Sequence, residues 1–89
     1  MLFMTVFAFE PEKRNEVLKR RAEKGEMVRT GVKVIGEWRA ISGGRVFRLV
    51  KTDDPKGLLA EDLTWGELGK VEIVPVIPVE EVFEVISRQ

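Results

Sequence analysis

The sequence predicts an α+β domain of ferredoxin-like type, in which the elements run β-α-β-β-α-β and a short C-terminal helix follows. Three observations predict it. Four segments rich in β-branched and aromatic residues alternate with helix-forming segments, Gly43-Gly44 separates the second of them from the third, and Asp54-Pro55 precedes the second helical segment. The 89 residues are expected to form one domain, 1–89.

The chain opens with a strand and a helix. Leu2 to Phe9 is apolar at both sets of alternating positions, which predicts a strand buried on both faces. Pro11 suits the first turn of a helix, where its missing N–H costs nothing. That helix is expected to end at Gly25. Its apolar stripe is Val17, Leu18 and Ala22.

The glycine pair has two interpretations, a phosphate-binding loop or the bend of a hairpin. A phosphate-binding loop leads into a helix, but "RVFRLV" after the glycines alternates as a strand does. Gly-Gly also tolerates the positive φ of a two-residue hairpin turn. We therefore expect a hairpin between strands 32–41 and 46–52, with no nucleotide at its tip.

A two-residue turn at Gly43-Gly44 predicts the pairing of the hairpin, with Trp38 opposite Leu49 and Arg39 opposite Arg48. The set expected to pack under the helices is Trp38, Ala40, Phe47 and Leu49. The opposite face then carries Glu37, Arg39 and Arg48. Facing arginines repel, so they either splay into water, pair with Glu37, or face a ligand or a dimer interface.

The second half of the chain repeats the strand–helix alternation. Asp54 is placed to cap a helix that begins at Pro55. The buried side of this helix is expected to be Leu58, Leu59, Leu63 and Trp65. Residues 71–77 predict the fourth strand, and "VEEVFEVISRQ" a short terminal helix.

The apolar character of both faces of the first strand predicts assembly. The fourth strand is similarly apolar. An antiparallel sheet with one solvated face alternates cleanly between apolar and polar residues, and this sheet does not. We therefore expect a homodimer formed through the sheet faces.

Composition excludes several classes of function. Fifteen basic residues balance fifteen acidic ones, so no nucleic-acid partner is expected. Cysteine, histidine and tyrosine are absent, which removes thiolate nucleophiles and the commonest zinc ligands, and neither metal nor cofactor is expected. The opening "MLFMTVFAF" lacks a basic leader and is too short to cross a bilayer, which predicts a cytoplasmic protein without a membrane partner. Charged residues make up 34%, as in thermophile proteins.

Candidate site residues come from the predicted layer between the helices and the sheet. Trp38, Phe47 and Trp65 are either core aromatics or the walls of a pocket for a planar ligand. Asp62 borders the apolar stripe of its helix, where it is either a solvated edge residue or the polar contact and general base of the pocket. Arg39 is the other catalytic candidate. Arg14 and Arg21, on one face of the first helix, either extend outward over apolar contacts or present cations to an anionic ligand.

Three segments resemble a family of small prokaryotic proteins classed as a domain of unknown function: "GEWRAISGGRVFRLVKTDDP", "LTWGEL" and "VEIVPV". The resemblance covers nearly the whole chain and implies membership of the dimeric α+β barrel group, in which two ferredoxin-like subunits press their sheets together. That group includes cofactor-free monooxygenases, muconolactone isomerase-like enzymes, chlorite dismutase-like haem proteins and ligand-sensing regulator domains. Many relatives have histidine where this chain has Arg39, and several have tryptophan where it has Glu61.

The function expected from these observations is that of a small dimer that binds a largely apolar molecule between its helices and its sheet. Two alternatives stay open. One is a cofactor-free enzyme of the monooxygenase or isomerase type, and the other is a structural or protein-interaction dimer.

Overall fold

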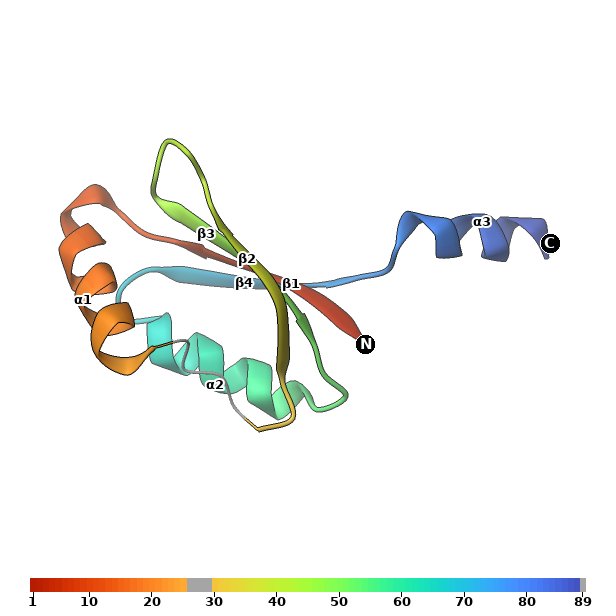
Figure 1. Ribbon diagram of the computed structural model, residues 1–89, viewed down its shortest axis with the longest axis horizontal. Helices are drawn as coiled ribbons and strands as arrows, with labels where there is room; N and C mark the ends of the chain where they lie inside the picture. The colour runs from red at the N-terminus through yellow and green to blue at the C-terminus, as the bar shows by residue number, and fades with distance from the viewer. Residues whose placement is uncertain (26–29, 89) are drawn as a thin grey trace.

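The computed structural model describes residues 1–25 and 30–88 as a four-stranded sheet with two helices on one face and a third helix beyond its end (Figure 1). The elements in chain order are β1 (Leu2–Ala8), η1 (Pro11–Lys13), α1 (Arg14–Lys24), β2 (Lys33–Arg39), β3 (Arg45–Lys51), α2 (Pro55–Trp65), β4 (Lys70–Val76) and α3 (Val79–Ser87). The strands and α-helices agree with the predicted order, but the first helix, expected to begin at Pro11, is preceded by the separate 3-10 helix η1. No helix in the described part of the chain is long and apolar enough to cross a membrane.

The sheet has the strand order β2-β3-β1-β4, and every neighbouring pair is antiparallel. This α+β architecture is compatible with the predicted ferredoxin-like fold. β1 lies in the interior of the sheet, with β3 on one side and β4 on the other. Its backbone N–H and C=O groups are therefore paired along both edges.

The hairpin between β2 and β3 bends at the glycines, as predicted, but with a longer loop. Gly43 and Gly44 both have a φ of 83°, which favours glycine, and a strand follows them. The N–H of Ala40 donates to the carbonyl of Arg45 (3.0 Å), so the loop contains four residues, 41–44. The pairing predicted from a two-residue turn is therefore wrong by two positions.

The longer loop changes the neighbours of Arg48. Glu37 lies opposite Arg48, and Trp38 lies opposite Phe47. The predicted Arg39–Arg48 contact is thus replaced by a pair of opposite charge, which is favourable across neighbouring strands. An even number of loop residues preserves the predicted division of side chains between two faces, because side chains alternate along a strand.

The helices cover the opposite face of the sheet from the one predicted. Trp65 of α2 contacts Phe7 of β1, with ring centroids 5.4 Å apart, so the face of Phe7 is the helix-covered one. By register, Thr5, Arg48 and Glu37 share that face. The remaining face, here called the open face, carries apolar side chains from all four strands: Leu2, Met4, Val6, Ala8, Trp38, Phe47, Leu49, Val74 and Val76.

The side chain of Trp38 lies on the open face and is 54% exposed. Its indole ring lies across Gly36, so close that a Cβ at Gly36 would be 2.5 Å from the ring. The prediction that Trp38, Ala40, Phe47 and Leu49 pack under the helices is therefore wrong. The apolar set lies opposite to the helices, and Glu37 and Arg48 lie beneath them.

Helix α2 begins as predicted and turns a different side inward. The Asp54 side chain accepts a hydrogen bond from the backbone N–H of Lys56 (2.9 Å), and Pro55 is the first helical residue. The inward positions follow the helical period, at Leu58, Glu61 and Trp65. The expected burial of Leu59 and Leu63 is wrong, since they are 55% and 72% exposed.

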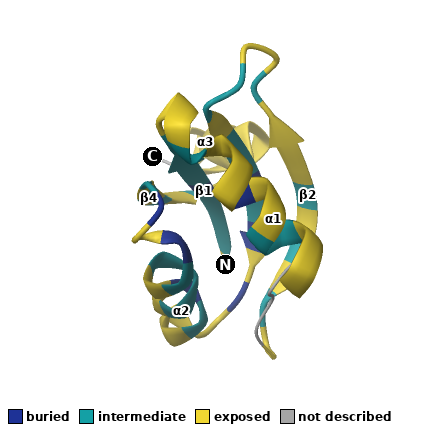
Figure 2. Cartoon of the chain, turned by 90° about the vertical axis from the view of Figure 1, so that its left-hand side faces the viewer, coloured by how far each residue is buried: buried dark blue, intermediate teal, exposed yellow. Residues whose placement is uncertain are grey.

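The core lies where α1, α2 and the sheet meet. Val17, Trp65 and Leu68 are buried there, and Phe7, Phe9 and Val71 pack against them. Arg20 of α1 donates to the carbonyl of Thr64 (2.7 Å), forms an ion pair with Glu67, and lies 5.9 Å from the centroid of a Trp65 ring. Arg20 therefore joins α1 to the C-terminal end of α2. Figure 2 shows how much of the outer surface of both helices remains exposed.

Candidate functional site

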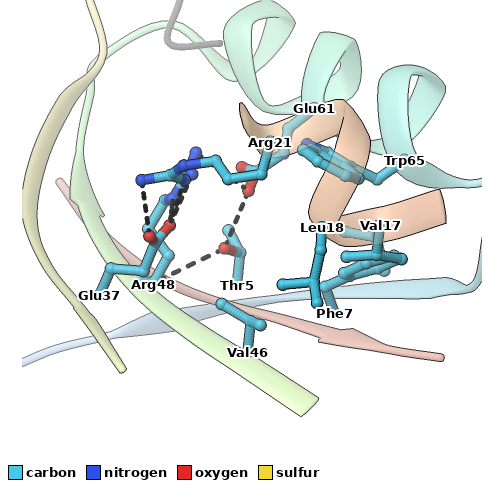
Figure 3. Close-up of a pocket in the computed structure, with 11 residues that line it drawn as sticks. Thr5, Phe7, Val17, Leu18, Arg21, Glu37, Val46, Arg48, Glu61 and Trp65 are labelled. Atoms are coloured by element: carbon cyan, nitrogen blue, oxygen red, sulfur yellow. Dashed lines mark hydrogen bonds and ion pairs between the residues drawn. The ribbon is translucent and has the colours of Figure 1, made fainter. Parts of the chain in front are cut away.

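A cavity of about 110 Å³ lies between α1, α2 and the helix-covered face of the sheet. Its lining residues come from six elements: Thr5, Phe7, Val17, Leu18, Arg21, Glu37, Val46, Arg48, Glu61, Trp65 and Val71. Figure 3 shows that apolar and polar side chains lie at opposite ends, with Phe7, Val17 and Trp65 at one end and the charged groups at the other. The cavity therefore has an apolar end and a polar end.

Arg48 is the centre of the polar end. Its side chain is only 7% exposed, although it carries a full positive charge. Two carboxylates surround it. Nε of Arg48 donates to Oε2 of Glu37 (2.7 Å), and Nη1 lies 3.6 Å from Oε1 of Glu61. A buried guanidinium is tolerated only with such partners, because an unpaired buried charge is costly.

Glu37 is held by two arginines from different elements. Besides Arg48 of β3, Arg21 of α1 donates to it through Nη1 (3.1 Å). Burial alone would raise the pKa of Glu37, but the hydrogen bonds and charges of Arg48 and Arg21 outweigh it and lower the pKa. Glu37 is thus ionised at neutral pH. The side chain of Arg21 is 37% exposed and reaches the polar end, where it pairs with Glu37.

Glu61 has the opposite electrostatic environment. Its side chain is 16% exposed, and burial raises the pKa of its carboxyl group. The charge of Arg48 and the hydroxyl of Thr5, which donates to Oε1 (3.2 Å), lower the pKa in part, while the charge of Glu37 adds to the rise. The two carboxyl groups of the polar end therefore differ in protonation behaviour, and Glu61 is the one suited to exchange a proton.

The raised pKa of Glu61 predicts a pH dependence of stability. A raised pKa in the folded state favours the protonated carboxyl, so this contribution is present below the unfolded value of 4.5 and is lost as pH rises through the folded pKa. When the free energy of unfolding is measured in urea at pH values from below 4.5 to above the folded pKa, Glu61→Gln is expected to lack this loss of stability. Thr5→Val removes a hydrogen bond to the ionised form of Glu61, so it is expected to make the free energy of unfolding fall more steeply as pH rises. If the free energy of unfolding depended on pH in the same way in wild type and Glu61→Gln, the raised pKa of Glu61 would be contradicted.

Of the candidate site residues, Trp65 and Arg21 line the cavity. Trp38 and Phe47 lie on the open face. Asp62, one position after Glu61, lines a separate groove with Phe3 and Leu58. The side chain of Arg39 lies beside Gly43 in the hairpin loop. The four predicted binding residues, Trp38, Trp65, Phe47 and Asp62, are therefore not brought together.

The site residues not predicted from the sequence are Glu61 and Thr5, and the inward direction of Glu37 and Arg48 was not predicted either. One signal for Glu61 was present, because it follows Leu58 by three residues and precedes Trp65 by four, which places all three on one helix face. For the described residues, no group of three or more acidic, histidine or cysteine side chains has the arrangement of a metal site.

Comparison with known proteins identifies a family. The profile of a family described as "Domain of unknown function (DUF3303)" matches residues 1–89. No curated protein and no solved structure matches the chain. Because the match spans the full length of the chain, the protein belongs to the DUF3303 family.

Proposed function

We propose that the protein binds a small, largely apolar molecule in the cavity between its helices and its sheet. The observation that supports this most is the division of one partly open cavity into an apolar end and a polar end (Figure 3). Ligand sites have this composition, with apolar and aromatic walls and a few convergent polar groups that fix orientation.

The volume of the cavity suits a ligand of about one ring. An apolar cavity of about 150 Å³ in another protein accepts benzene, and this one has about 110 Å³. The four charged groups of the polar end, Arg21, Glu37, Arg48 and Glu61, balance formally. Arg48 already donates to Glu37, so a neutral hydroxyl that reaches Glu61 or Thr5 fits better than a carboxylate.

Fluorescence of Trp65 tests the proposal. The chain has two tryptophans, so Trp38→Phe leaves Trp65 as the only one. Titration of this variant with phenol or benzyl alcohol is expected to give a saturable change. In the same background, Glu61→Met should weaken the binding of phenol about tenfold, because a buried hydroxyl loses its partner. Asp62→Asn, the neighbouring position outside the cavity, is the matched control and should leave affinity unchanged. Equal affinities in all three proteins, or no saturation, would overturn the proposal.

A second candidate function is acid–base catalysis without a cofactor, and the raised pKa of Glu61 favours it. In this proposal Glu61 takes the role first assigned to Asp62 or Arg39. It would remove a proton from carbon in a small substrate, as isomerases do. Deuterium incorporation from D₂O into acetylacetone, followed by NMR, tests this role. Incorporation should fall to the buffer rate in Glu61→Gln and persist in Asp62→Asn.

We also propose that the protein is a homodimer in which a second copy covers the open face, as in the dimeric α+β barrel group. The support is the run of apolar side chains across all four strands, with Trp38 54% and Val74 37% exposed. Patches of this kind in small proteins mark interaction sites. Sedimentation equilibrium is expected to give a dimer for wild type and a monomer for Phe47→Asp. A wild-type monomer at micromolar concentration would contradict it.

A further inference from the structure

Helix α3 carries an apolar stripe, and none of the other described helices and strands packs extensively against this helix. Its apolar residues recur at the helical period and are 40–66% exposed: Val79, Val82, Phe83 and Ile86. Figure 1 shows α3 beyond the end of the sheet, away from α1 and α2. A nine-residue helix is only marginally stable in water without tertiary packing. The stripe therefore requires a partner surface.

The connection to β4 keeps this stripe away from the open face of the same chain. Only Ile77 and Pro78 separate β4 from α3. Pro78 is extended, with φ −59° and ψ 142°, so α3 continues outward from the end of β4 (Figure 1). The helix and its own open face thus point to different regions of space.

The charges of α3 and of the open face are complementary. The polar side of α3 carries Glu80, Glu81 and Glu84. On the open face the cations lie at the two ends of the strands, and they are Lys33, Lys51, Arg45 and Lys70. Glu72 is the one acidic side chain among the paired strand residues of that face. An acidic helix with an apolar stripe therefore matches an apolar sheet with basic ends.

We propose that α3 of one copy packs on the open face of a second copy, and that the exchange is reciprocal. Two equal contacts of this kind follow from twofold symmetry, in which each surface meets its complement on the partner. The proposal rests on the proposed homodimer and goes further, because it makes α3 the exchanged element. The apolar stripe would cover part of the β1 and β3 side chains, and the glutamates would lie near the lysines and arginines at the strand ends.

Cross-linking between differently labelled copies tests the exchange. The chain has no cysteine, so each introduced cysteine is the only one. Unlabelled Phe83→Cys protein is mixed with ¹⁵N-labelled Met4→Cys protein and treated with a short bismaleimide. Mass spectrometry is expected to find a mixed-label link between positions 83 and 4. Glu84→Cys, on the polar side of α3, is the matched control and should give at least about tenfold less product. A link within one chain of a Met4→Cys/Phe83→Cys variant at high dilution, or no mixed link, would overturn the proposal.

A second measurement separates this proposal from the proposed dimer. Phe83 is 65% exposed, so Phe83→Asp should fold normally, as circular dichroism can verify. It is expected to raise the dimer dissociation constant by about tenfold or more, while phenol still binds near Trp65. If Phe47→Asp abolishes the dimer and Phe83→Asp leaves it unchanged, the dimer stands and the role of α3 is refuted. If neither variant changes assembly, both are refuted.

Discussion

Replacing Trp65 with alanine is expected to lower the free energy of unfolding by roughly 3–5 kcal/mol, measured by urea denaturation. The side chain is 7% exposed, contacts Phe7, and packs with Val17 and Leu68 in the core. The total stability of small domains is about 5–15 kcal/mol, so this loss removes a large share of it.

The matched control for this prediction is Leu63→Ala on the same helix. Leu63 is 72% exposed, and surface substitutions change stability by about 0.5 kcal/mol or less. Similar losses for the two variants would show that α2 does not turn Trp65 inward, and the cavity would lose one of its walls.

Replacing Arg48 with methionine is expected to cost about 3 kcal/mol, because Glu37 and Glu61 lose the cation between them. The double variant Arg48→Met/Glu37→Leu should recover most of this loss. Buried ion pairs often give little net stability compared with apolar side chains of similar volume, whereas a single unpaired charge is strongly destabilising. Glu61 tolerates the loss of the Arg48 cation better than Glu37, because burial already raises its pKa and so favours the neutral carboxyl.

A double-mutant cycle measures this coupling. The free energies of unfolding of wild type, both single variants and the double variant are compared at pH 7. A coupling between Arg48 and Glu37 of about 1–3 kcal/mol is expected. Additive effects of the two substitutions would mean that the pair is solvated, and the polar end of the cavity would then be an open surface.

Local signals explain why the elements could be predicted. Pro11, Gly25 and Asp54-Pro55 act on the residues beside them, and the structure begins or ends its helices there. The glycine pair likewise bends the chain by its own conformational freedom. Such features need no knowledge of distant parts of the chain, which is why the order of strands and helices agrees.

The direction of the sheet faces could not be predicted from the same signals. Alternation divides side chains into two sets but does not say which set the helices cover. Hydrophobicity placed Trp38, Phe47 and Leu49 inward, whereas Arg48, from the opposite set, is buried. Its burial depends on Glu37, Glu61, Thr5 and Arg21, which come from four other elements. These contacts form only when the chain has folded, so neither the contacts nor the candidate site could be predicted from local signals.

Intermolecular nuclear Overhauser effects between phenol and methyl-labelled protein test most directly whether the cavity is the binding site. Contacts are expected to the methyl groups of Val17, Val46 and Val71, which line the cavity. Contacts instead to Leu49, Val74 and Val76 would place the ligand on the open face and contradict the account.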